Sequence, residues 1–164
     1  FMQAFEVAAK AGRDLRYSGS RLGMVTSAFC LAPYNALVAS ANGGLVACFE
    51  IASDTHALAQ LSTIGQIEGG QVRVDEAARD SLHALIAEHR AGCRDCFCYW
   101  SCAGDCYTRS FDAEAGVWQH GVRCEINRLL MEKMLLRGIA EGGGVWRSAY
   151  RSSAPLSLAA LTAG

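Results

Sequence analysis

Cysteine is the residue type in this chain whose spacing could do chemistry, and it occurs eight times in 164 residues. Thiolates are soft ligands that select zinc, copper(I) and iron–sulfur clusters, and a tetrahedral centre needs donors that converge from separate segments. Five of the eight cysteines crowd into residues 93–106, where a two-residue gap lets neighbours bind one centre. Seven follow one spacing pattern and predict a metal-cluster frame: Cys30, Cys48, Cys93, Cys96, Cys102, Cys106 and Cys124.

Three further roles for the cysteines fit the sequence less well. A disulfide scaffold is disfavoured because cysteine makes up only about half of the roughly one-tenth share typical of such scaffolds. Residues 93–106 are also too crowded for several unstrained bridges. Structural zinc stays open as an alternative, although a zinc ribbon would show two similar C-x2-C pairs and only Cys93/Cys96 has that spacing. Inert core thiols do not fit a segment rich in Gly, Asp and Arg.

The spacing also carries a family resemblance. The pattern C-x(9 to 15)-G-x4-C, a gap, C-x2-C-x5-C-x3-C, a gap, C resembles the SPASM domain, the auxiliary-cluster extension of many radical S-adenosylmethionine enzymes that modify peptides and proteins. The resemblance runs from about Arg16 to about Leu136 and fills all seven family cysteine positions. The intervening sequences CRDCFCYWSCAGDC and RCEINR are similar as well.

The resemblance implies two auxiliary 4Fe–4S clusters whose ligand sets interlock along the chain. It assigns three cysteines to the first cluster and four to the second. The first set is Cys30, Cys48 and Cys106, and the second set is Cys93, Cys96, Cys102 and Cys124.

The first of these clusters would lack a fourth cysteine. Some family members have a further cysteine shortly after the first, whereas the segment after Cys30 here reads LAPYNALV. One iron would therefore be open to water, a substrate group or a non-cysteine side chain. Cys98 lies outside the pattern, and we expect a partly buried thiol beside the second cluster; completion of the first cluster by Cys98 is the alternative.

The C-x3-C-x2-C triad that binds the S-adenosylmethionine-cleaving cluster of such enzymes occurs nowhere in the chain. The chain also opens inside a helical pattern, with Phe1, Phe5 and Ala8 on one face and Gly12 as a stop. Asp14–Ser18 then alternates like a strand. We therefore expect residues 1–24 to be the end of a truncated radical S-adenosylmethionine barrel, residues 25–140 the auxiliary-cluster domain, and residues 141–164 a loosely ordered tail.

Local patterns predict an α+β fold, with a small β-hairpin and helices wrapped around two iron–sulfur clusters. Asn35–Ser40 and Leu45–Ile51 are apolar runs, and Asn42-Gly43 between them suits the positive φ of a tight turn that would bring Cys48 towards Cys30. Residues 52–74 indicate a loop with at most one short strand. Residues 93–106 lack periodicity, as a cluster-wrapping loop would.

Two helices are predicted to flank this loop. One begins near Asp75 or Glu76 and ends at Gly92, with its apolar residues on one face. The other follows Cys124 and ends near Gly138. Tyr99 and Trp100, in the loop itself, are expected to shield a cluster from water. The histidines are expected to be packed or solvated residues rather than ligands: His56, His83, His89 and His120.

Composition limits the remaining classes of function. Apolar residues make up 51% of the chain and support a core, and the net charge of −1 mixes both signs. The sequence has no basic patch that would indicate nucleic-acid binding, and it has no apolar run of about 18 residues that would indicate a membrane span. Exposed thiolate clusters need a reducing compartment, so the cytoplasm is expected.

On this basis we expect an iron–sulfur domain of a radical S-adenosylmethionine peptide or protein maturase. It would serve in electron transfer or substrate anchoring, with a peptide or protein substrate and an electron-carrier protein as partners. Without the triad the chain is expected to be inactive alone, with S-adenosylmethionine bound only by the full-length parent. The alternative is a free-standing structural metal-binding module, zinc or iron–sulfur, without catalysis.

Overall fold

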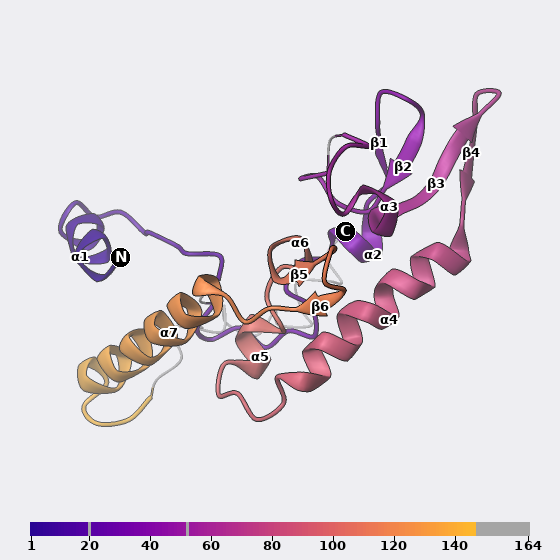
Figure 1. The fold of residues 1–164 in the computed structure, drawn as a ribbon. Helices are drawn as coiled ribbons and strands as arrows, with labels where there is room; N and C mark the ends of the chain where they lie inside the picture. The colour runs from indigo at the N-terminus through magenta and orange to yellow at the C-terminus, as the bar shows by residue number, and fades with distance from the viewer. Residues whose placement is uncertain (20, 52, 147–164) are drawn as a thin grey trace, which may run out of the picture.

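The computed structural model describes residues 1–19, 21–51 and 53–146. In these residues helices are combined with antiparallel strands, so the predicted α+β class is confirmed (Figure 1). The helices are α1 (Met2–Lys10), α2 (Ala32–Asn35), α3 (Ala59–Ser62), α4 (Glu76–Gly92), α5 (Tyr99–Cys102), α6 (Tyr107–Ser110) and α7 (Val122–Glu141). The strands are β1 (Val38–Ala39), β2 (Gly44–Val46), β3 (Thr63–Glu68), β4 (Gln71–Val74), β5 (Phe111–Asp112) and β6 (Val117–Trp118).

The predicted hairpin is present but shorter than expected. β1 and β2 pair antiparallel, with Val38 opposite Val46, and Gly43 takes a φ of 86° in the turn. The beginning of the expected first strand is instead the short helix α2, whose first turn contains Pro33. Proline suits that place because its fixed φ is helical and its missing N–H would be unpaired there anyway.

The prediction for residues 52–74 was wrong, because two strands follow there rather than at most one. β3 and β4 form a hairpin that extends the sheet to the order β1-β2-β3-β4. Gly69 and Gly70 make its turn with φ values of 57° and 78°, the conformation that a two-residue hairpin turn requires. The hairpin projects from the body of the molecule in Figure 1.

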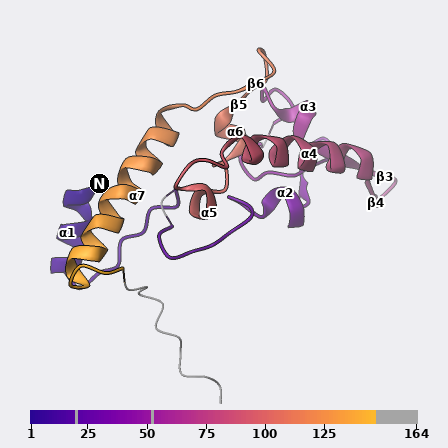
Figure 2. The same ribbon diagram turned by 90° about the horizontal axis from the view of Figure 1, so that it is seen from below.

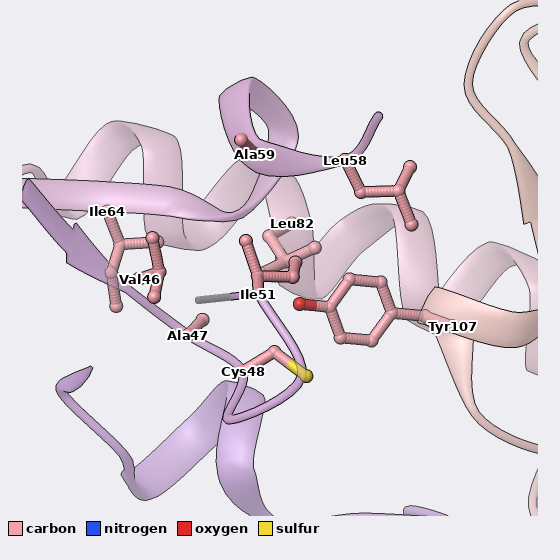
Figure 3. Close-up of a cluster of buried hydrophobic side chains, with 9 residues drawn as sticks. All are labelled: Val46, Ala47, Cys48, Ile51, Leu58, Ala59, Ile64, Leu82 and Tyr107. Atoms are coloured by element: carbon pink, nitrogen blue, oxygen red, sulfur yellow. The ribbon is translucent and has the colours of Figure 1, made fainter. Parts of the chain in front are cut away.

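Helix α4 forms as predicted and carries the core. Asp75 caps it, accepting a hydrogen bond from the backbone N–H of Ala78 at 3.0 Å, and Leu82 on its inner face is fully buried. The core packs this helix against the sheet and against the turn after β2 (Figure 3). Its members are Val46, Ala47, Cys48, Ile51, Leu58, Ala59, Ile64, Leu82 and Tyr107.

Helix α7 passes through the glycine at which it was predicted to end. Gly138 lies inside the helix. A Cβ at this position would collide with the ring of Trp146, so the glycine permits close packing and does not end the helix. Gly142 caps the helix, and Gly143 and Gly144 follow with positive φ. The expected tail falls mostly on residues 147–164, which lie outside the described residues.

The N-terminal helix agrees with the sequence pattern and the expected strand does not. α1 ends just before Gly12, whose φ is 65°. Asp14–Ser18 forms no strand, because no partner segment hydrogen-bonds to it within the described residues. α1 lies beside α7 across a groove (Figure 2), and it has no buried residue of its own.

None of the helices in the described residues is both long enough and apolar enough to cross a bilayer.

Candidate metal centre

The first cysteine set lines one cavity, which we call the three-cysteine cavity. Cys30, Cys48 and Cys106 reach it from three distant segments of the chain. Its other lining residues are mainly apolar: Ala28, Phe29, Pro33, Ile86, Asp105 and Tyr107.

The second set lines a separate cavity, the five-cysteine cavity. All four members of the set lie there, together with Cys98. The structure therefore divides the seven pattern cysteines between two cavities in the same way as the family pattern does. The five thiols belong to Cys93, Cys96, Cys98, Cys102 and Cys124.

The sheet and its core position the three-cysteine cavity. Cys48 follows β2 directly and is itself a core residue with 8% exposure. Cys106 precedes α6, whose first residue, Tyr107, belongs to the same core. The Tyr107 hydroxyl lies 2.9 Å from the Ser62 hydroxyl, which fixes the ring beside Cys48 (Figure 3). Cys30 completes the cavity from the segment before α2 and is exposed.

Turns and helix ends position the five-cysteine cavity. Cys93 is the C-cap of α4, and Cys102 is the last residue of α5. Cys124 lies in the first turn of α7, two residues later than the helix start, so the prediction that this helix follows Cys124 was wrong by that margin. The expectation of an irregular segment between Cys93 and Cys106 is met except for the single turn of α5.

Three consecutive residues, Ala103, Gly104 and Asp105, have positive φ values of 52°, 89° and 66°. This left-handed turn separates Cys102 of one cavity from Cys106 of the other. Residues other than glycine are strained there, and a Cβ at Gly104 would lie only 3.3 Å from the His89 ring and 3.4 Å from the Arg90 Cα. The His89 ring supports the turn, with its Nε2 2.8 Å from the Gly104 carbonyl oxygen.

Hydrogen-bond donors already point at the sulfur atoms. The backbone N–H of Ala32 lies 3.4 Å from Cys30 Sγ, and the Asn127 side-chain amide donates to Cys102 Sγ at 3.7 Å. The Thr108 hydroxyl, 3.0 Å from Cys106 Sγ, instead donates to Glu50 Oε2 at 2.8 Å and therefore accepts from that thiol. Donors such as the Ala32 N–H and the Asn127 amide stabilise thiolates and set the potentials of iron–sulfur clusters. The residues of both cavities therefore fit a thiolate-ligated cluster.

Without metal, the cavities favour neutral thiols. Burial, followed by the nearby thiols of Cys96 and Cys102, raises the pKa of Cys98 to about 12. Burial, followed by the Asp105 carboxylate, raises the pKa of Cys102 to about 11. Burial also raises the pKa values of Cys93, Cys106 and Cys124. A metal that binds here must displace these protons.

The thiols are not arranged around one ion. Within the described residues, no three His, Cys, Asp or Glu side chains converge closely enough to hold a single metal ion. A four-iron cube binds each thiolate at a different iron and so holds them further apart than one zinc ion would.

Cys98 lies beside the second set, as expected, but it is fully buried, with 2% exposure, rather than partly buried. The alternative, in which Cys98 completes the first cluster, is not supported because this thiol does not line the three-cysteine cavity. Apart from the cysteines, the residues of that cavity whose side chains carry an oxygen atom are Asp105 and Tyr107.

Some of the predictions for the aromatic residues and the histidines agree with the structure and others do not. Tyr99 lines the five-cysteine cavity, whereas Trp100 is 58% exposed and shields neither cavity. His83 stacks on Tyr34 and lies 2.8 Å from the Pro33 carbonyl oxygen, so it is packed as expected.

His89 and His120 both line the five-cysteine cavity. Burial lowers the pKa of His89, whose ring stacks on Trp118 with the ring centroids 3.9 Å apart. The remaining histidine, His56, accepts a hydrogen bond from the backbone N–H of Leu58.

Sequence reasoning missed the polar residues that hold the site together. Asp105 and Arg123 form a two-pronged ion pair, with Nε–Oδ2 and Nη2–Oδ1 distances of 3.0 and 2.9 Å. Asn127, which bonds Cys102, is 1% exposed. The position of Arg123 and Asn127 beside Cys124, one residue before it and three after it, was the signal that could have found them.

Comparison of the chain with protein-family models, with curated proteins and with solved structures gave no match.

Proposed function

We propose that this chain is an iron–sulfur domain that holds two auxiliary 4Fe–4S clusters for a radical S-adenosylmethionine enzyme. That enzyme would modify a peptide or protein. The clusters would serve in electron transfer, in substrate anchoring or in both. Its partners would be the peptide or protein substrate and an electron-carrier protein, and its compartment the reducing cytoplasm.

One observation carries the proposal: the seven pattern cysteines separate into two cavities of three and four pattern thiols. The resemblance, which rests on sequence alone, assigns Cys106 and its neighbour Cys102 to different sets. The left-handed turn at residues 103–105 separates them, so that Cys106 joins Cys30 and Cys48.

The chain's own residues would hold and tune the clusters. Bound clusters would supply one-electron transfer. Ala32 and Asn127 would keep hydrogen bonds on two of the thiolates, those of Cys30 and Cys102, and burial of Cys48 would limit access of water. In the three-cysteine cavity the fourth position would be left to a substrate group, to water or to an oxygen of Asp105 or Tyr107.

A structural zinc module is the competing function, and the single C-x2-C pair disfavours it, since a zinc ribbon has two. Anaerobic reconstitution with iron, sulfide and zinc in competition tests the choice. We expect about eight irons per chain and the EPR signals of two clusters after reduction. Stoichiometric zinc without iron would contradict the proposal.

The assignment to a larger enzyme has its own test. The pure, reduced chain should release no 5′-deoxyadenosine from S-adenosylmethionine, because that chemistry needs a separate cluster with an open iron. The gene sequence upstream of Phe1 should encode a C-x3-C-x2-C barrel. Release of the nucleoside by this chain alone would contradict the assignment.

A further inference from the structure

Among the described residues, Asp105 is the one charged residue that lines both cavities. It stands between Cys102 of the five-cysteine cavity and Cys106 of the three-cysteine cavity. Its side chain is 6% exposed, and both of its oxygens bind Arg123. A buried carboxylate needs such a partner, because an isolated charge is strongly disfavoured away from water.

Arg123 touches the segments that carry three of the cysteines. It directly precedes Cys124 and binds the residue that precedes Cys106. Its guanidinium also lies over the ring of Phe29, the residue before Cys30, at 5.6 Å from the ring centroid. A shift of this side chain therefore moves ligands of both cavities together.

The position of Arg123 is not explained by helix stability. It is the second residue of α7, and a cation at a helix N-terminus is unfavourable because the helix dipole is positive there. The left-handed turn at residues 103–105 is strained as well. Both unfavourable features are maintained around one ion pair that lies between the cavities.

We infer that the Asp105–Arg123 ion pair couples the loading of the two cavities, so that a cluster in one cavity favours the ligand geometry of the other. The inference rests on the proposed function. A cluster bound by Cys102 and Cys124 would fix a residue three positions before Asp105 and the residue next to Arg123. The pair in turn fixes the backbone before Cys106 and the ring before Cys30, which orders the three-cysteine cavity.

The test is to load the full chain anaerobically with substoichiometric iron and sulfide and to count zero-, one- and two-cluster chains by native mass spectrometry. Coupled loading depletes the one-cluster chains. We expect the product of the empty and doubly loaded populations, divided by the square of the one-cluster population, to exceed the value for independent loading by about fivefold or more.

Asp105→Asn should return the populations to independent loading, because asparagine tolerates the left-handed φ but cannot neutralise Arg123. Arg123→Lys keeps the charge without the two-pronged contact and should weaken the coupling. The matched control is Glu68→Gln, which makes the same acid-to-amide change in the exposed Arg73–Glu68 pair and should leave the populations unchanged. If the Asp105→Asn protein does not fold, the cluster populations of Arg123→Lys, measured in the same way, test the coupling instead.

Reduction potentials give a second readout, which a purely structural role would not move in this way. Removal of the Asp105 charge should raise the potentials of both clusters, and Arg123→Met should lower both. If two clusters bind but the natural chain loads them independently, or if Asp105→Asn leaves the coupling unchanged, this inference is wrong and the proposed function still stands. A natural chain that takes up no iron would overturn the proposed function and this inference with it.

Discussion

The two cavities are built from different kinds of structure. The three-cysteine cavity shares Cys48 and Tyr107 with the hydrophobic core, and Ile86 packs against that core. The five-cysteine cavity is made by the end of α4, the single turn of α5 and the start of α7. None of its five thiols belongs to the core cluster of the described residues.

This difference implies that the two cavities form for different reasons, one through burial of the core and the other through metal binding. Folding of the sheet onto α4 forms most of the three-cysteine cavity without metal, since burial of the core drives it. The thiols of the five-cysteine cavity lie outside that core cluster, so we expect metal binding to supply much of the folding free energy of this cavity.

Loss of a ligand from each cavity should give the largest effects. Cys124→Ala and Cys48→Ala should each remove about four of about eight irons, because each cluster loses a ligand. In metal-free protein only Cys48→Ala should lower the free energy of unfolding, by roughly 0.5–3 kcal/mol, because only Cys48 belongs to the core. Iron counting and urea unfolding measure both; equal destabilisation by the two variants would contradict the comparison.

A change in the core should affect the cavities unequally. Leu82→Ala removes a fully buried side chain and should cost about 2–5 kcal/mol of unfolding free energy. The iron of the three-cysteine cavity should be lost to a chelator faster than in the natural chain, while that of the five-cysteine cavity is retained. Val72→Ala, at an exposed position on β4, is the control and should change neither quantity.

Alkaline pH should destabilise the metal-free chain through the five-cysteine cavity. Burial and neighbouring thiols raise the pKa of Cys98 from 9.0 to about 12. The folded state thus prefers the neutral thiol, so its stabilisation is complete below pH 9 and is lost as the pH rises towards 12. Thermal melts across this window measure the effect, and a Cys98→Ala variant should show a smaller slope; an identical slope would exclude Cys98 as the cause.

The smallest effect is expected when Cys98 itself is removed from loaded protein. Cys98→Ala should keep the irons of both clusters, because this thiol lies outside the ligand pattern, and should cost about 1 kcal/mol of stability. Iron counting and EPR distinguish the outcomes. If iron fell as in Cys124→Ala, Cys98 would be a ligand of the five-cysteine cavity.

Structural features with a local cause could be predicted from the sequence. The cap at Asp75 and the periodicity after it predicted α4, and Asn42-Gly43 predicted the first hairpin. The β3–β4 hairpin was missed because Gly65 interrupts the alternation of β3. Gly65 is needed there because a Cβ would collide with the backbone of Arg73 on the neighbouring strand.

Features with a long-range cause could not be predicted. Gly138 looks like a helix end until Trp146 is placed against it. Asp14–Ser18 alternates like a strand, yet in the described residues it finds no strand to pair with. The contact of Asp105 with Arg123 joins residues 18 positions apart and depends on the left-handed turn, which no residue pattern indicated.

The path of the chain between the cavities limits how such a protein can change during evolution. The chain reaches the three-cysteine cavity twice, the five-cysteine cavity three times at pattern positions, then returns to each once, at Cys106 and Cys124. No single cut separates the two ligand sets. Recombination or insertion can therefore neither exchange one centre for another nor discard it as a module, and the two centres must be inherited together.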